Sequence, residues 1–195
     1  SVSVMSFFLT LISCDNVPLL ARMANAAVRG YSGRPLKLAC TRYYLSPTLL
    51  GGVPPDFADL LERDRFSLLL NEADGAAGFP VKMPKDSEPV LMQNARYLVP
   101  VIGMDCIGRA AAPDVIFRYD VFLKQFPDMA GKPLTPQRAA AILMHPRGVC
   151  RDWKAGTTIL PYINKLDDPE QDAAGEELSR AILRNGNFPV DRVVC

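Results

Sequence analysis

The stretch TILPYINKLDDPEQDAAGEELSRAILR, residues 158–184, decides the fold class of this chain. It starts with a short apolar run over residues 158–163, which predicts a buried strand. Asp168 then supplies a helix N-cap and Pro169 the first helical residue, so the rest of the stretch is predicted to be helical. A further apolar run at residues 190–194 predicts a last strand. A strand, a helix and a strand in this order are typical of a parallel sheet.

Strands and helices alternate through the remainder of the chain as well. Apolar runs predict four earlier strands, within residues 1–13 and at 36–41, 66–70 and 97–103. Spacing, caps and breakers predict helices at 15–30, 57–61, 119–126 and 136–143, and loops at 47–55 and 75–89. We therefore expect the α/β class, with a mostly parallel sheet, helices on both of its faces, and residues 1–195 forming one domain.

The first predicted strand has an alternative interpretation. Residues 1–13 read SVSVMSFFLTLIS, and with Cys14 they also resemble a short secretory segment that ends in a lipoprotein cleavage box. No Lys or Arg precedes Cys14, so the basic region that opens a secretory signal is missing. A strand buried on both faces produces the same apolar pattern, and we favour the strand.

Composition narrows the function classes without selecting one. The 195 residues carry 22 Lys plus Arg and 21 Asp plus Glu, a net charge of +1. Basic residues do not cluster with aromatic ones, which argues against nucleic-acid binding. No apolar run approaches the roughly 18 residues of a membrane span. One histidine and five scattered cysteines argue against a zinc cluster and fit a reducing compartment, so we expect a cytoplasmic protein without nucleic-acid or membrane partners.

The fifth predicted strand ends in a motif with specific chemistry. Asn164, Lys165 and Asp167 spell N-K-x-D, the pattern with which GTPases read guanine. In that pattern the aspartate accepts two hydrogens from the guanine edge, the asparagine amide faces the acceptors of the base, and the lysine stem covers its plane. A polar turn that leads into the helix cap at Asp168 explains the same letters, and both interpretations remain open.

Acidic residues follow the third predicted strand. Glu72 or Asp74 could hold Mg²⁺, directly or through water, as carboxylates do in nucleotide hydrolases. Asp74 and Gly75 also form one of the commonest turn pairs, and from the letters alone we favour the turn.

The glycine-rich loop that holds phosphate in nucleotide hydrolases is missing at the expected place. Residues 12–18 read ISCDNVP, without glycine or lysine; Asp15 adds negative charge, and Pro18 has no N–H to donate. If a nucleotide binds, other cations must hold its phosphates, and the candidates are Lys82, Arg42 and Arg118.

No residue identifies itself as catalytic. His145 follows the helix predicted at 136–143, where a single histidine is more often a packing residue than a catalyst. Cys106 and Cys150 have no evident base partner in the sequence, which makes a cysteine nucleophile a weak hypothesis. Whether the chain is an enzyme stays open at this point.

Several segments match one known family in the same order. They are NEADGA at residues 71–76, Lys82 with Pro84, EP at 88–89, VIGMDCIG at 101–108, GKPLTP at 131–136, HPRG at 145–148 and LPYINKLD at 160–167. With these segments the chain resembles the selenium-dependent molybdenum hydroxylase accessory proteins, the YqeC-like family. The resemblance covers residues 66–195 well and extends more weakly to the N-terminus.

The resemblance implies a three-layer fold like that of P-loop nucleoside triphosphatases, and a role in the maturation of molybdenum hydroxylases. It implies nucleotide contacts for Asn164, Lys165 and Asp167, and a metal contact for Asp74. The chain departs from the family where members carry a G-x-G-G-K-T loop, because residues 12–18 take that place. The family's threonine run becomes ACTR at residues 39–42, and its His-Arg pair becomes FR at 117–118.

Two functions from different classes follow from these observations. In the first, which we favour, the chain is an accessory protein on a degenerate nucleotide-hydrolase scaffold, and it binds a molybdenum hydroxylase, a cofactor-maturation protein or a ligand without efficient hydrolysis. In the second, it is a working GTP- or ATP-dependent hydrolase that uses Mg²⁺ and non-standard phosphate contacts.

Overall fold

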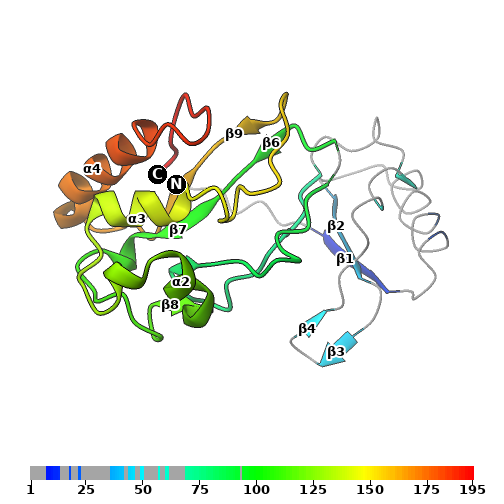
Figure 1. The fold of residues 1–195 in the computed structure, drawn as a ribbon. Helices are drawn as coiled ribbons and strands as arrows, with labels where there is room; N and C mark the ends of the chain where they lie inside the picture. Colours follow the sequence, from blue (N-terminus) through cyan, green and yellow to red (C-terminus); the bar gives the residue numbers. More distant parts are fainter. Residues whose placement is uncertain are drawn as a thin grey trace. The chain divides into compact units, whose positions relative to one another are not determined.

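A computed structural model describes residues 8–13, 18, 22, 36–41, 44–46, 49–50, 57, 60–61, 69–92 and 94–195 (Figure 1). The chain divides into two compact units, Ser1–Asn71 and Glu72–Cys195. Among the residues that the structure describes, no helix is both long and apolar enough to cross a membrane.

The first unit contains the first two predicted strands. Strand β1 (Phe8–Ser13) pairs in parallel with β2 (Leu36–Thr41), and the register runs from Phe8 opposite Leu36 to Ser13 opposite Thr41. Most of the helix predicted at 15–30 lies outside the described residues, although Pro18 and Arg22 are helical. A parallel pair needs a crossover connection rather than a tight hairpin.

The second unit is built on three further parallel pairs. Strand β5 (Val81–Lys82) pairs with β8 (Ile116–Phe117), β6 (Tyr97–Leu98) with β9 (Thr158–Ile159), and β7 (Val101–Gly103) with β10 (Tyr162–Asn164). The α/β class and its parallel strands are therefore confirmed, while the three-layer arrangement stays a prediction.

The predicted strands at 97–103 and 158–163 are each interrupted by a proline. Pro100 separates β6 from β7, and Pro161 separates β9 from β10. The two segments nevertheless stay paired along their length, because the N–H groups of Thr158, Leu160 and Tyr162 donate to every second carbonyl from residue 96 to residue 100, at 2.8–3.0 Å. A proline removes a donor but keeps its carbonyl, so the ladder continues past it.

The helices of this unit follow the sequence prediction closely. Helix α2 spans Tyr119–Gln125, α3 spans Pro136–Leu143 and α4 spans Asp172–Leu183. Thr135 caps α3 by accepting from the Arg138 N–H, and Asp168 caps the 3-10 turn before α4 by accepting from the Glu170 N–H. Helices α3 and α4 pack side by side, as Figure 1 also shows.

The core of the second unit joins these helices to the strands. Ile102, Ile159 and Ile163 come from the strands and are buried together with Leu178 and Ile182 of α4. Burying each such side chain stabilises the fold by about 1.5–3 kcal/mol. This core fixes the strand ends that carry the charged residues described below.

Two predicted loops contain strands. Residues 75–89 include β5, which is buried although its surroundings are rich in proline and glycine. Residues 47–55 include β4 (Leu49–Leu50), which pairs antiparallel with β3 (Tyr44–Ser46). Strands of two residues are too short for their periodicity to be read from the sequence.

Three predicted elements differ from the structure. The strand expected at 190–194 is reduced to one bridge, in which Val194 exchanges hydrogen bonds with Pro161 and Ile163 around Tyr162. Of the strand expected at 66–70, residues 69–70 have no regular structure and 66–68 lie outside the described residues. In the helix expected at 57–61, Phe57 and Leu60 have 3-10 conformation and Leu61 lies in a bend.

Candidate functional site

Cations lie at the carboxyl ends of three parallel strands in the second unit. Lys82 is the last residue of β5, Arg118 follows β8 directly, and Lys165 follows β10 directly. Arg118 and Lys165 have φ values of 62° and 61°, in the left-handed region that non-glycine residues rarely adopt. Each such conformation costs on the order of 1–3 kcal/mol, and such residues concentrate at functional sites.

The first of these cations is buried in an ion pair. The Lys82 ammonium pairs with Asp74 Oδ1 and donates to the Gly75 carbonyl oxygen at 2.6 Å. Only 5% of the Lys82 side chain and 9% of the Asp74 side chain are exposed. Lysine and aspartate are almost never buried to this extent unless they are paired, so each charge depends on the other.

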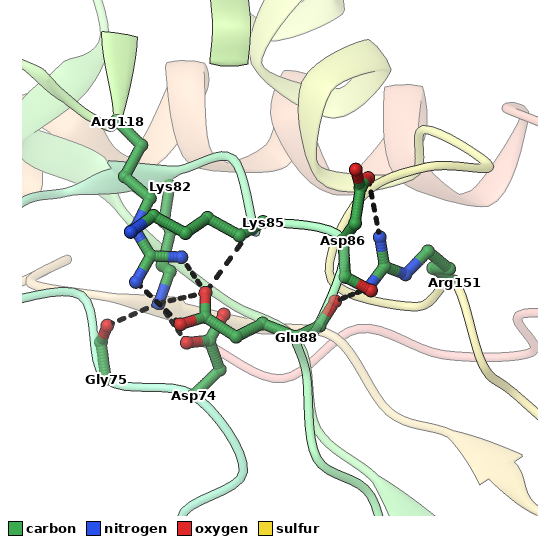
Figure 2. Close-up of polar contacts among 8 residues, drawn as sticks. All are labelled: Asp74, Gly75, Lys82, Lys85, Asp86, Glu88, Arg118 and Arg151. Atoms are coloured by element: carbon green, nitrogen blue, oxygen red, sulfur yellow. Dashed lines mark hydrogen bonds and ion pairs between the residues drawn. The ribbon is translucent and has the colours of Figure 1, made fainter. Parts of the chain in front are cut away.

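Glu88 adds a second carboxylate to the same place (Figure 2). Both terminal nitrogens of Arg118 contact it, with Nη2 donating to Oε1 at 2.6 Å. The Lys82 Nζ lies 3.5 Å from Oε2, and the Lys85 backbone N–H donates to the same oxygen at 3.3 Å. A two-nitrogen contact between arginine and carboxylate fixes direction as well as charge.

Arg151 holds the main chain that carries Glu88. Its guanidinium donates to the Glu88 carbonyl oxygen and, at 2.5 Å, to the Asp86 carbonyl oxygen. We call Asp74, Lys82, Glu88, Arg118 and Arg151 the charge cluster.

An aromatic ring lies beside the two central cations of the charge cluster. Lys82 Nζ is 5.3 Å and Arg118 Cζ 5.1 Å from the centroid of the Phe117 ring. Phe79 packs on Phe117, with ring centroids 5.4 Å apart. The negative face of an aromatic ring attracts cations, so the ring favours the charged forms where water is scarce.

Burial and charge act against each other on Lys82. Burial lowers the pKa of Lys82 from its ordinary value of 10.5, the hydrogen bond and charge of Asp74 raise it, and Arg118 lowers it further. The net direction is downward. The lysine therefore depends on Asp74 to stay charged in this position.

Asp74 and Glu72 were candidates for a magnesium site. Asp74 Oδ2 is buried and has no hydrogen-bond partner, which would suit a metal contact. Its other oxygen is engaged by the Lys82 ammonium, however, and the described part of the chain contains no group of three or more His, Cys, Asp or Glu placed to hold a metal ion. Because Mg²⁺ in nucleotide sites takes only one or two protein carboxylates beside water and phosphate oxygens, a magnesium contact at Asp74 or Glu72 stays a prediction.

The N-K-L-D motif begins at Asn164, the last residue of β10, and continues into the segment that follows this strand. Lys165 Nζ donates to Asp105 Oδ2 at 2.7 Å, and the Asn164 side-chain oxygen accepts from the Lys165 N–H at 2.9 Å. Asp167 is exposed. The lysine that would cover a guanine ring is thus directed to a carboxylate of its own chain.

Gly103 permits the approach of Asp105. A Cβ at residue 103 would lie 2.3 Å from Asp105 Oδ1 and 2.9 Å from the Pro80 Cβ. The Gly103 N–H donates to the Pro80 carbonyl at 2.9 Å, which joins the end of β7 to the residue before β5. Only glycine fits this close contact.

The surroundings of His145, Cys106 and Cys150 fit packing roles rather than catalysis. The His145 ring packs edge-on against Phe126 at 4.8 Å, and burial, aided by Arg147, lowers its pKa. Cys106 and Cys150 are buried, and burial raises the pKa of each thiol to about 12. Since the thiolate is the nucleophile, neither cysteine suits nucleophilic catalysis.

The structure brings together Asp74, Lys82 and Arg118 from the predicted site residues, and Glu72 acts electrostatically on Lys82. Arg42 and residues 14–17 lie outside the described residues. Sequence reasoning missed Glu88 and Arg151 as members of the cluster. The available signal for Glu88 was its place in the EP segment of the family resemblance, and no signal indicated Arg151.

Fold and site together define an α/β protein with a self-paired charge cluster at its strand ends. The sequence model of the family described as "YqeC protein" matches residues 21–120, about half of the chain, and the chain belongs to this family. It is 28% identical over 141 residues to the Escherichia coli (strain K12) protein described as "Uncharacterized protein YqeC". That alignment covers 69% of this chain and 53% of the relative, so the chain spans about half the relative's length. No solved structure matches the chain.

The family resemblance drawn from the sequence is thereby confirmed.

Proposed function

We propose that this YqeC-family chain is an accessory protein for the maturation of a molybdenum hydroxylase, and that it acts by binding a partner or ligand rather than by turning over a nucleotide. Family membership supports the accessory role, together with the family-like segments between residues 71 and 167. The charge cluster supports the mode of action.

One observation carries the preference for binding over turnover. Lys82 and Arg118, which would have to hold phosphates in place of a glycine-rich loop, are already paired with Asp74 and Glu88. Hydrogen bonds to charged groups contribute about 1.5–3 kcal/mol each. A triphosphate would have to replace several of these bonds, and residues 12–18 offer neither glycine nor lysine to make good the difference.

A nucleotide-dependent hydrolase remains the second candidate. It is favoured by the N-K-L-D motif at the end of β10 and by the left-handed conformation of Lys165 within it. In this alternative, Lys165 would leave Asp105 and cover a guanine base.

A ligand-binding experiment separates the two candidates. Thermal melts of the purified chain would be recorded with millimolar Mg-ATP and Mg-GTP, together with phosphate release over several hours. A nucleotide at ten times its Kd would raise the stability by about 1.4 kcal/mol. We expect neither a shift nor turnover; a GTP-dependent shift that is lost in Asp167→Asn would favour the hydrolase.

A cellular experiment tests the accessory role. In cells that lack the chain, we expect molybdenum hydroxylase activity to fall while the amount of hydroxylase polypeptide stays constant. Wild-type chain and the Arg109→Gln variant, altered at an exposed ion pair with Asp114, should restore the activity. Arg118→Gln should restore less. Hydroxylase activity that is unchanged without the chain would contradict the proposal.

A further inference from the structure

The Glu88 carboxylate makes the contacts that a bound oxyanion would make. Its two oxygens contact both terminal nitrogens of Arg118, the Lys82 ammonium and the Lys85 backbone N–H. Planar guanidinium groups, ammonium groups and backbone N–H groups are the donors that proteins use for phosphate. Glu88 is thus an internal anion in a set of donors suited to an external one.

The Glu88 side chain can leave this place while its main chain stays. Arg151 holds the carbonyl groups of Asp86 and Glu88, and the Val90 N–H donates to the Ala73 carbonyl at 3.2 Å. These bonds secure the backbone on both sides of the side chain. Rotation about side-chain bonds is therefore enough to move the carboxylate.

Solvent reaches the outer part of the charge cluster. The side chains of Glu88 and Arg118 are 22% and 16% exposed, whereas Lys82 and Asp74 are only 5% and 9% exposed. An incoming anion would meet Arg118 first and Lys82 behind it. Phe117 lies beside both cations and limits their freedom to follow Glu88 outward.

We propose that Lys82, Arg118 and the Lys85 N–H form a latent site for a phosphate-bearing ligand, and that the Glu88 side chain is a displaceable plug that closes it. The inference rests on the proposed function, because it names the ligand chemistry of a protein that binds without turnover. Asp74 stays in place and keeps Lys82 charged.

The number of acceptor oxygens explains why phosphate rather than a carboxylate displaces the plug. Displacement of Glu88 leaves Arg118 without its carboxylate and removes one of the two carboxylates beside Lys82. A phosphate group offers more acceptor oxygens to Arg118, Lys82 and the Lys85 N–H than the carboxylate it replaces, whereas another carboxylate brings no advantage over an anion that is already tethered.

Phosphate binding to the Glu88→Gln variant tests the plug. Inorganic phosphate and glycerol 3-phosphate are titrated into wild type and variant, and binding is followed by NMR of the protein amides. When the competent state has a small population, the apparent Kd rises by the inverse of that fraction. If Glu88 closes the site in more than about nine-tenths of wild-type molecules, the Glu88→Gln variant should bind phosphate at least about tenfold more tightly than wild type. Tighter binding of glycerol 3-phosphate would identify an esterified ligand, and tighter binding of inorganic phosphate a free one.

Two further variants make the result specific. Asp114→Asn is a matched carboxyl-to-amide change that releases Arg109 at an exposed ion pair, and it should give no gain. Adding Arg118→Gln to Glu88→Gln should abolish the gain. A folded Glu88→Gln variant without tighter binding, an equal gain in Asp114→Asn, or a gain that survives the loss of Arg118 would each overturn the plug.

The wild-type chain provides a readout that needs no variant. Because the Lys85 N–H donates to Glu88 Oε2 and would donate to the ligand once the plug is displaced, the NMR signal of the Lys85 amide should shift when phosphate is added. An unshifted Lys85 amide signal at saturating phosphate would also refute the plug. Neither result bears on whether the chain hydrolyses nucleotides, so the plug and the proposed function fail separately.

Discussion

Replacing Lys82 by methionine should destabilise the second unit more than any exposed charge change. The substitution keeps the length of the side chain but removes its ammonium, and it leaves the Asp74 carboxylate, 9% exposed, without its partner. Removing one member of a buried ion pair costs about 3–5 kcal/mol, because the remaining charge is uncompensated. For a chain of 150–250 residues this corresponds to a decrease in Tm of about 6–20 °C.

The assay uses the single tryptophan of the chain. Trp153 packs against Phe188, with ring centroids 6.3 Å apart, and donates to the Thr157 carbonyl, so its fluorescence reports tertiary structure in the second unit. Urea unfolding followed by fluorescence gives the free energy of unfolding of Lys82→Met and wild type.

Two controls separate the buried pair from general effects. Arg180→Met removes an exposed helical pair with Glu176 and should cost only about 0.3–0.5 kcal/mol. In the double variant Lys82→Met with Asp74→Asn the uncompensated charge is gone, and at least about 2 kcal/mol of the loss should return. If the free energy of unfolding of the single Lys82→Met variant lay within about 1 kcal/mol of the wild-type value, buried Asp74 would not depend on Lys82 as its partner.

Other expectations follow from single residues. His145, the only histidine, should titrate by NMR below its ordinary pKa of 6.5, and since folding favours its neutral form, the unfolding free energy should fall as the pH drops through 6.5. In the native chain Cys106 and Cys150 should resist alkylation, whereas exposed Cys195 should react, as peptide mass spectrometry would show. Gly103→Ala should destabilise by about 1–3 kcal/mol in the same urea assay, because its Cβ meets atoms that cannot move freely.

Each of these expectations has its contrary result. A histidine pKa at or above 6.5 would mean that the ring is solvated. Rapid alkylation of either buried cysteine would mean that the core opens readily. For Gly103, the control is Gly175→Ala in α4, where the new Cβ meets only the flexible end of Leu166 and alanine favours the helix by about 1 kcal/mol. Equal losses in the two glycine variants would contradict the close contact at Gly103.

Local signals in the sequence were enough to predict the helices. Thr135 followed by Pro136 indicates the start of α3, and Asp168 followed by Pro169 indicates the turn before α4. In both pairs the capping side chain accepts from a backbone N–H only two or three residues further along the chain. The apolar pattern also predicted strands at 97–103 and 158–163 in a mostly parallel sheet, but it did not show that these two segments pair with each other.

The charge cluster could only be predicted in part. Asp74 was predicted to follow a strand, and Lys82 and Arg118 were named only as alternative cations for phosphates, whereas Arg151 contacts the Glu88 carbonyl across 63 residues of sequence. Strand β5 has only two residues, which is too short to show an alternating hydrophobic pattern, and the residues around it suggest a loop. Pairing of distant charges depends on the packed fold, which a single sequence does not reveal.

We expect the cations at these strand ends to stay paired with the chain's own carboxylates rather than to act on a nucleotide. Phosphate release from Mg-ATP and Mg-GTP by the purified wild-type chain is the most direct test. Its rate should equal that of a protein-free blank. Release at about 1 s⁻¹ or faster, within the ordinary range of enzymes, would contradict this expectation.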